Sequence, residues 1–228
     1  MCFIQIGSGS ANYDSYIKDG FTNFVKKQKI KENIYIIEAN SIHIDNLEVF
    51  WKLDKNIKIF NLAIVPDNNN SKKMEFFYCL EDAPNYQVFS NSKLFVRKHF
   101  PDGIIVKKLV DCIKFSEFLK KQNIHKVNYL SIDIEGMDFE VLINLDLKKF
   151  EFKNISFEHL HLTFLQKIKI VYKFVKNGYF FSGMGFDLRK SDWMFTKKYE
   201  SKKFTTFLLP ITPRRIWKKY SFSDRIYY

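Results

Sequence analysis

The sequence predicts an α/β fold built on an open, mostly parallel β-sheet. Short apolar runs alternate with amphipathic segments of helical length along most of the chain, and this alternation is typical of parallel sheets. Several apolar runs end in polar residues, as strands do where an open sheet binds a ligand at its carboxyl edge. No repeat or linker interrupts the 228 residues, so we expect a single domain over residues 1–228.

Each element is predicted from the spacing of its apolar residues. Strands are predicted where apolar residues run together, at residues 2–7, 33–40, 57–65, 74–80, 103–110, 127–134 and 152–161. Helices are predicted where apolar residues recur every three or four positions, at residues 12–30, 41–53, 115–123, 137–145 and 164–178. Ser41 is the expected cap of the second helix, and the last helix ends at Gly178.

Two further segments complete the predicted architecture. Residues 179–188 and 191–198 predict a C-terminal hairpin. Residues 81–103 show no clear period, and we expect a variable, irregular segment that forms part of the wall of a ligand site.

Composition limits the classes of partner. The net charge of +12 favours anionic partners without choosing among them. Lysine supplies most of this charge, and there are five arginines. An enzyme that reads nucleic acid would more often use arginine forks, so we expect no nucleic-acid partner. Cys2, Cys79 and Cys112 are isolated and indicate free thiols rather than disulfides or metal ligands.

The location expected from the sequence is the cytoplasm. No apolar run approaches the length of a membrane span, because lysines interrupt each candidate. The chain also begins inside a predicted strand, which leaves no room for a signal peptide.

The segment "IGSGSAN" places a Gly-x-Gly turn directly after the first predicted strand. A dinucleotide fingerprint needs a third small residue and an acid about twenty residues later. Here Asn12 occupies the third position, and Glu38 lies farther along the chain. A turn with no phosphate to hold suits a nucleoside with an amino-acid tail, whose ribose hydroxyls Glu38 could bind. S-adenosylmethionine fits that description. Alternatively, Gly7 and Gly9 merely form a tight turn and Glu38 caps the next helix.

The segment "YLSIDIEGMDFEVL" (129–142) ends a buried strand with two carboxylates, Asp133 and Glu135. Strand side chains alternate, so both are expected on one face, where like charges repel. They could cap the next helix, share a proton, bind a cation or grip sugar hydroxyls. His159 and His161 follow the next predicted strand, again on one face, and titrate near neutrality. We predict that these four residues form the catalytic group.

Five segments, in order, resemble those of a known family: "FIQIGSGSANYD", "IYIIEANSIHIDNL", "IKIFNLAIV", "LSIDIEGMDFEVL" and "ISFEHLH". They are similar to the FkbM-type methyltransferases, S-adenosylmethionine-dependent enzymes that mostly O-methylate sugars and sugar-like natural products. The most specific segment is "SIDIEGMDFEVL", which is similar to the family's I-D-x-E-G-x-[DE]-x-x-V-L. Asn40 stands where the family usually has proline, and "GSGSAN" replaces the commoner G-A-N-x-G turn.

The resemblance implies a Rossmann-like sheet of the class I methyltransferase type and a cofactor, S-adenosyl-L-methionine. It also implies a cofactor site at the glycine turn, at the end of the second strand, near the alanine of "NLAI" and at the paired carboxylates. The cofactor residues are then Gly7, Ser8, Gly9, Ser10, Asn12, Glu38, Ala39, Ala63 and Asp133. The reaction implied is O-methyl transfer to a sugar or sugar-like acceptor, in surface glycan (capsule, lipopolysaccharide) or natural-product biosynthesis.

The acceptor side of the site is less defined by motifs. We predict that the acceptor is contacted by Tyr86, Arg97, His99 and Glu158. The expected acceptor is a small molecule or a glycan, and it could be anionic or nucleotide-linked. A divalent metal (Mg²⁺ or Mn²⁺) is an alternative that we do not favour, because no ligand spacing is diagnostic of a metal. The basic and aromatic residues 214–228 could stack on a glycan, contact an anionic membrane or pack on the domain.

Two other functions stay open at this point. An RNA methyltransferase is supported by the net charge of +12 alone. A non-catalytic partner subunit that retains the cofactor fold is the other alternative.

Overall fold

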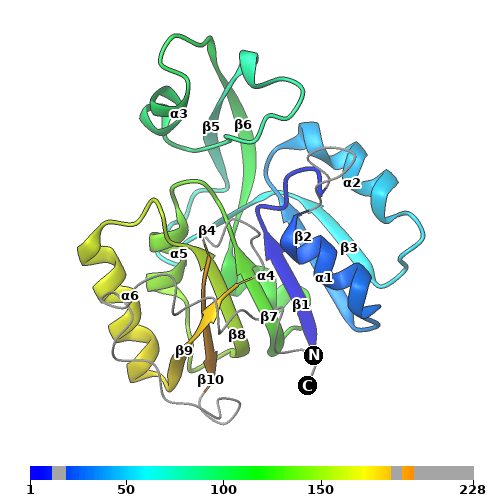
Figure 1. Ribbon diagram of the computed structural model, residues 1–228, viewed down its shortest axis with the longest axis vertical. Coiled ribbons are helices and arrows are strands. Elements are labelled where there is room, and N and C mark those ends of the chain that lie inside the picture. Colours follow the sequence, from blue (N-terminus) through cyan, green and yellow to red (C-terminus); the bar gives the residue numbers. More distant parts are fainter. Residues whose placement is uncertain (12–18, 186–191, 198–228) are drawn as a thin grey trace.

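A computed structural model of the protein describes residues 1–11, 19–185 and 192–197 (Figure 1). The start of the predicted helix 12–30, the cofactor candidate Asn12 and residues 214–228 lie outside the described residues.

The large sheet confirms the predicted α/β fold. Its seven strands run in the order β3-β2-β1-β7-β8-β10-β9. The pairs β3–β2, β2–β1, β1–β7 and β7–β8 are parallel, and β10 is antiparallel to both β8 and β9. The β9–β10 pair is the predicted C-terminal hairpin. The strands are β1 (Cys2–Ile6), β2 (Asn33–Glu38), β3 (Ile57–Asn61), β7 (Lys126–Ile132), β8 (Glu151–Glu158), β9 (Tyr179–Met184) and β10 (Asp192–Lys197).

The strand order reverses between β1 and β7. The chain passes from β1 outward to β2 and β3, and later resumes on the other side of β1 with β7 and β8. Ligands of open α/β sheets bind outside the carboxyl ends of the strands at such a switch point. The fold therefore places the candidate site where Ile6 and Ile132 end their strands side by side.

Helices cover both faces of this sheet because its strand side chains alternate. In β2, Ile34 and Ile36 pack with α1 and α2, whereas Tyr35 and Ile37 face the cluster that contains residues of α4, α5 and α6. The helices are α1 (Gly20–Gln28), α2 (Ile44–Trp51), α3 (Lys93–His99), α4 (Phe115–Lys121), α5 (Asp138–Asn144) and α6 (Phe164–Lys176), with short 3₁₀ turns η1 (Ser41–His43) and η2 (Leu80–Asp82).

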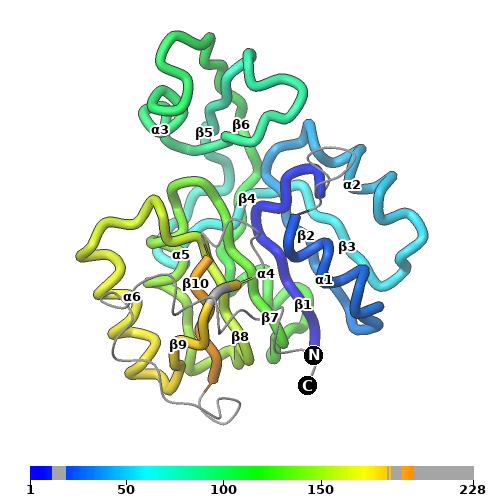
Figure 2. Tube along the Cα trace, viewed as in Figure 1, coloured from blue at the N-terminus to red at the C-terminus, as the bar shows by residue number. Residues whose placement is uncertain are grey.

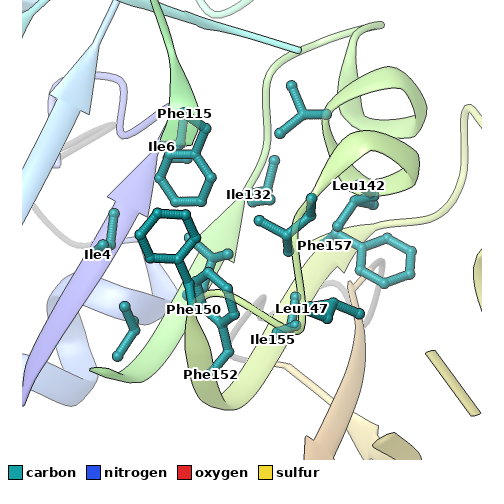
Figure 3. Packing of buried hydrophobic residues seen from close by; sticks show 14 of the residues in the cluster. Ile4, Ile6, Phe115, Ile132, Leu142, Leu147, Phe150, Phe152, Ile155 and Phe157 are labelled. Atoms are coloured by element: carbon teal, nitrogen blue, oxygen red, sulfur yellow. The ribbon is translucent and has the colours of Figure 1, made fainter. Parts of the chain in front are cut away.

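The larger hydrophobic cluster lies between β1, β7 and β8 and their covering helices (Figure 3). Phe152, Ile155 and Phe157 from β8 are fully buried there. Phe157 stacks on Phe195 of β10 with 6.0 Å between ring centroids, so the antiparallel hairpin shares the same core. This packing holds the carboxyl ends of β7 and β8 at a fixed separation.

A second, three-stranded sheet extends from beside the large one to the upper part of Figure 2, where α3 lies with it. Its order is β4-β6-β5, with β4 (Ala63–Val65), β5 (Lys73–Cys79) and β6 (Ile105–Lys114). The prediction of one strand over 57–65 was therefore wrong, since β3 and β4 belong to different sheets. The side chain of Asn61 donates to the carbonyls of Glu38 and Ala39, at 2.9 and 3.3 Å, at the point where the chain changes sheet.

Residues 81–103 are also more ordered than predicted, because they contain α3. Ser92 caps this helix by accepting a hydrogen bond from the amide of Phe95 at 3.2 Å. Its seven residues are too few for the period to stand out from the polar sequence around it.

Other element bounds differ by a few residues. The first helix begins at Gly20, after Asp19 accepts hydrogen bonds from the amides of Phe21 and Thr22. The cap near residue 41 is Asn40 rather than Ser41, since Asn40 accepts a hydrogen bond from the amide of Ile42. Within the described ranges, no helix is long and apolar enough to cross a membrane. Cys2, Cys79 and Cys112 are free thiols, as predicted.

Candidate active site

The glycine turn after β1 lies directly against the end of β7. Gly7 has a φ of +78°, and a Cβ atom there would stand 1.6 Å from the main-chain oxygen of Asp133. Glycine is therefore required both by conformation and by space. The amide of Asp133 in turn donates to the carbonyl of Ile6 at 2.9 Å. The turn predicted to bind a nucleoside and the predicted catalytic carboxylate are thus neighbours.

Glu38 has a structural role that its sequence position did not reveal. One carboxylate oxygen accepts hydrogen bonds from the amides of Ser8 and Gly9, at 3.0 and 2.8 Å, and the other accepts from the amide of Asn40 at 2.7 Å. Glu38 is only 5% exposed to solvent. Burial raises the pKa of Glu38, although nearby His43 and the three amides act in the opposite direction. Glu38 thus stabilises the glycine turn. That its carboxylate also accepts hydrogen bonds from ribose hydroxyls stays a prediction.

The other cofactor candidates surround this turn. Ser8 is buried, whereas Gly7, Gly9 and Ser10 are partly exposed. Ala63 is buried in the apolar cluster formed with β5 and β6, and Ala39 packs partly buried against the same cluster. These positions place an apolar surface beside Glu38, as an adenine ring would require, and the individual contacts to a cofactor stay predictions.

The two carboxylates occupy a loop rather than a strand, which corrects the predicted strand end. β7 ends at Ile132, and Glu135 has a φ of +45° followed by Gly136 at +110°. Asp138, at the start of α5, accepts hydrogen bonds from the amides of Ile134 and Gly136, at 3.2 and 3.4 Å, and so secures this loop. The hydrogen bonds to Asp138 at the start of α5, rather than the alternation of strand side chains, determine the conformation of this loop.

Asp133 and Glu135 are electrostatically coupled despite this correction. Burial raises the pKa of Asp133 well above its usual value, and the charges of Glu135, Glu158 and Asp138 add to the shift. Burial likewise raises the pKa of Glu135 to about 8, with Glu158 as the next contributor. Asp133 is nevertheless reached by solvent.

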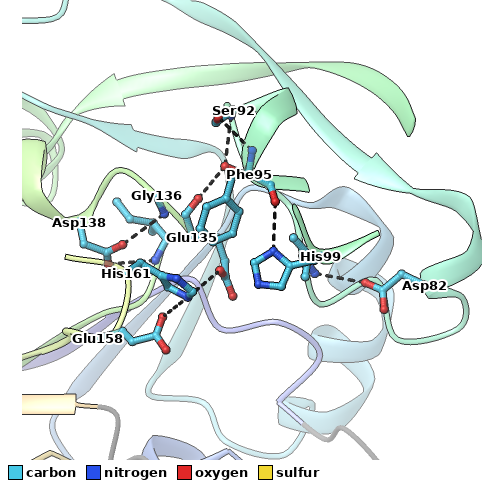
Figure 4. A network of polar contacts seen from close by, with 12 residues as sticks. Asp82, Ser92, Phe95, His99, Glu135, Gly136, Asp138, Glu158 and His161 are labelled. Atoms are coloured by element: carbon cyan, nitrogen blue, oxygen red, sulfur yellow. Dashed lines mark hydrogen bonds and ion pairs between the residues drawn. The ribbon is translucent and has the colours of Figure 1, made fainter. Parts of the chain in front are cut away.

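The structure separates the two histidines that the sequence grouped together. β8 ends at Glu158, before either of them. His159 is buried and stacks on Trp193, with 4.8 Å between ring centroids and 13° between ring planes. His161 instead lies against the carboxylates (Figure 4), with its Nε2 atom 3.2 Å from Glu158 Oε2 and 3.8 Å from Glu135 Oε2.

The protonation states around His161 follow from its surroundings. Burial lowers the pKa of His161, and the neighbouring His99 lowers it further. Two nearby carboxylates would ordinarily hold a proton on the imidazole. Because the pKa of Glu135 is raised to about 8, most of Glu135 carries a proton at neutral pH and offers little negative charge. His161 is therefore mainly neutral at pH 7.

The segment 81–103 contributes one predicted acceptor residue to this group. His99 approaches His161 with 5.9 Å between ring centroids. Arg97 instead donates to the carbonyls of Pro101 and Gly103, so it braces its own loop. The carbonyl oxygen of Tyr86 lies 3.2 Å from His43 Nε2, and the ring of Tyr86 packs on the ring of Tyr78. Of the predicted acceptor residues, the structure therefore brings together His99 and Glu158.

Three residues that shape this site were not predicted from the sequence. Phe95 packs edge-on against His161 at 4.8 Å between centroids, and Ser90 donates through its hydroxyl to the carbonyl of Glu135 at 2.6 Å. No sequence signal marks either residue, because both act across long separations in the chain. Asp138 did carry a signal, since it follows Gly136 at a fixed spacing in "DIEGMD".

Comparison with known proteins agrees with this geometry. The model of the methyltransferase FkbM domain matches residues 5–186, which include the end of β1, the glycine turn, Glu38 and the acidic loop. No curated protein matches the chain. The matched span covers most of the sequence and contains all the described helices and all the strands except β10 and the first residues of β1. The chain belongs to the FkbM methyltransferase family.

Proposed function

We propose that this methyltransferase transfers a methyl group from S-adenosylmethionine to a hydroxyl of a sugar or sugar-like acceptor. The observation that supports the proposal best is the contact of the Gly7 turn with Asp133 at the sheet's switch point. That contact joins a partly exposed glycine turn to a cluster of carboxylates. The biological setting we propose is surface glycan or natural-product biosynthesis.

The residues present suit this donor in charge and shape. S-adenosylmethionine carries a sulfonium and an ammonium group, both positive at its amino-acid end. Asp133, Glu135, Glu158 and Asp138 cluster at this edge of a protein whose net charge is +12, so a cationic group bound among them would favour their ionised forms. Ala39 offers a partly buried apolar surface on the other side of Glu38. The nucleoside end would lie there, with the amino-acid end at the Gly7 turn.

The chemistry asks for positioning and for a proton acceptor. When bound, S-adenosylmethionine supplies a methyl carbon attached to a positively charged sulfur. The acceptor oxygen forms the new bond to that carbon as the carbon–sulfur bond breaks, its electron pair returns to sulfur, and the hydroxyl proton passes to a base. We propose Asp133, Glu135 and His161 as the candidates for that base. His159, buried against Trp193, would support the site without touching the acceptor.

The acidic cluster bears on the RNA alternative. Phosphate backbones are bound by lysine and arginine, and binding weakens steeply with salt. The charges that raise the pKa values of Asp133 and Glu135 are those of carboxyl groups, and we propose that the acceptor hydroxyl binds beside them. A neutral hydroxyl-bearing acceptor therefore fits this position better than a polyanion.

The donor half of the proposal is tested by calorimetry with S-adenosylmethionine and its demethylated product. Glu38→Gln keeps one acceptor oxygen, enough for the amides of Ser8 and Gly9, but its NH₂ group would face the amide of Asn40. Glu38→Ala removes every acceptor. Hydrogen bonds to a charged group are worth about 1.5–3 kcal/mol each, so we expect Glu38→Ala to lower affinity by roughly 10- to 100-fold or more. Tight binding of NADH with none of S-adenosylmethionine would contradict the proposal.

The part of the proposal that concerns the acceptor is tested by measuring methyl transfer. Incubation of the protein with methyl-labelled donor and a panel of mono- and oligosaccharides, including nucleotide-linked sugars, should yield an alkali-stable O-methyl product detected by mass spectrometry. Retained donor affinity without transfer to any hydroxyl acceptor would favour the non-catalytic alternative.

A further inference from the structure

Three side chains from the ends of β7 and β8 converge on one point, as Figure 4 shows. Glu135 comes from the loop after β7, Glu158 ends β8, and His161 lies three residues later. Each offers one ligand atom, and these atoms lie within 4.8 Å of one another. We propose that Glu135, Glu158 and His161 bind a divalent cation of the Mn²⁺ or Mg²⁺ class.

The separations are close to those of a coordination shell. Neighbouring ligands in an octahedral site with bonds of about 2.1 Å are roughly 3 Å apart. The His161 Nε2 atom is 3.2 Å from Glu158 Oε2 and 3.8 Å from Glu135 Oε2. Side-chain movements of less than about 1 Å would bring the three atoms onto one face of such a shell, leaving the other positions for water and acceptor oxygens.

The donor set is more specific than a group of acids. His161 supplies an imidazole nitrogen, Nε2, which lies within 4 Å of an oxygen of each carboxylate. The Oε2 atom of Glu135 has less than 1 Å² of accessible surface and accepts no hydrogen bond in the described part of the chain. A buried carboxylate oxygen without a donor is costly, and a cation would satisfy it. Two carboxylates would also balance the charge of a divalent ion.

Neighbouring residues hold these ligands in position. The Ser90 hydroxyl fixes the carbonyl of Glu135, and Phe95 packs against the ring of His161. The ligand side chains keep 25%, 14% and 33% exposure for Glu135, Glu158 and His161, so solvent can reach the point between them. An ion there would be both supported by the protein and open to exchange.

The consequence for the reaction rests on the proposed function. A cation at this point would coordinate the acceptor hydroxyl and lower its pKa, as bound metals do for water. The proton would then pass to Asp133, whose charge the cation would stabilise, and the oxygen would attack the methyl carbon. His161 would act as a ligand and not as the base.

Cation binding is tested with MnCl₂ on the whole chain, purified after chelator treatment. Calorimetry and the electron paramagnetic resonance signal of free Mn²⁺ should both report one site, and MgCl₂ should compete for it. Glu158→Gln and His161→Ala should each weaken Mn²⁺ binding by at least about 10- to 100-fold, a loss that even outer-shell changes typically produce. Thermal unfolding of each variant checks that the fold is retained.

Glu140→Gln is the matched control, because it removes the same charge from an exposed position in α5. It should change Mn²⁺ affinity less than about twofold. Absence of Mn²⁺ binding at millimolar concentration, or equal weakening in Glu140→Gln and Glu158→Gln, would overturn the inference.

The same samples separate this inference from the proposed function. Methyl transfer that persists in excess chelator, with no Mn²⁺ bound, would reject the cation site and leave the proposed function intact. Mn²⁺ binding that depends on Glu158 and His161, with no affinity for S-adenosylmethionine, would support the site and reject the proposed function.

Discussion

The hydroxyl of Ser90 donates a hydrogen bond to the main-chain oxygen of Glu135, with 2.6 Å between the two oxygens. These residues lie 45 positions apart in the chain. The bond ties the segment that contains α3 to the acidic loop after β7. Ser90 also accepts from the amide of Ser92, the residue that caps α3. Changes in the 81–103 segment should therefore reach the carboxylates directly.

Ser90→Ala tests that coupling. Ser90 is fully buried, and its loss leaves a buried carbonyl without its donor, which should lower the free energy of unfolding by about 1–3 kcal/mol. Turnover should fall as well, because the loop carrying Glu135 is released. Ser92→Ala removes only the helix cap and should cost about 1 kcal/mol, with turnover nearly unchanged. Urea unfolding and turnover assays measure both, and equal loss of turnover would argue against the coupling.

Gly7→Ala tests the contact between the glycine turn and β7. The new Cβ would fall 1.6 Å from the carbonyl oxygen of Asp133, so β1 and β7 would have to separate. We expect a loss of more than about 4 kcal/mol, or no folded protein. Gly178→Ala is the control, since Gly178 has a φ of +80° but nothing within 4 Å. Its conformational strain alone should cost about 1–2 kcal/mol. Similar denaturation midpoints for the two variants would show that the close contact of Gly7 with Asp133 does not determine the loss of stability.

The two histidines should give opposite results. His161 lies between Glu135 and Glu158, so His161→Ala should lower turnover by at least roughly 10- to 100-fold through loss of a ligand of the proposed cation, with the stability of the fold little changed. His159 stacks on Trp193 in a buried position, so His159→Ala should lower the unfolding free energy instead. Single-turnover rates and urea unfolding on both variants separate these outcomes. Full turnover in His161→Ala would remove it from the chemistry.

Asp138 predicts a pH dependence of stability. Burial raises its pKa to about 6 from the ordinary value of 3.8, although the amides of Ile134 and Gly136 partly oppose the shift. The folded protein thus binds this proton more tightly than the unfolded chain. Its contribution to stability is complete below pH 3.8 and is lost as the pH rises through 6.

Asp138→Asn cannot titrate, so it isolates this contribution. The unfolding free energy of the wild type relative to the variant should fall by about 2 kcal/mol between pH 4 and pH 6.5, since each pKa unit is worth about 1.4 kcal/mol. Urea unfolding of both proteins at these two pH values gives the comparison. A difference that does not change with pH would contradict the raised pKa.

The sequence by itself determined the sheet, the family and the positions that flank the switch point. Apolar runs and helical periods are local patterns, so they identified β1, β2, β7 and β8 and most helices. The motif "IDIEGMD" marked Asp133 and Glu135 for the same reason. Strand alternation misjudged them, however, because the positive φ of Glu135 breaks the strand geometry on which alternation depends.

Only the tertiary structure decided how distant side chains combine. Glu38 turned out to hold the glycine turn through the amides of Ser8 and Gly9, an interaction that spans about thirty residues. His159 and His161, two positions apart in the turn after β8, lie in a buried stack and in an acidic cluster, respectively. Such outcomes depend on packing between elements and on the loss of water around charges. Neither is encoded in the spacing of residues along the chain.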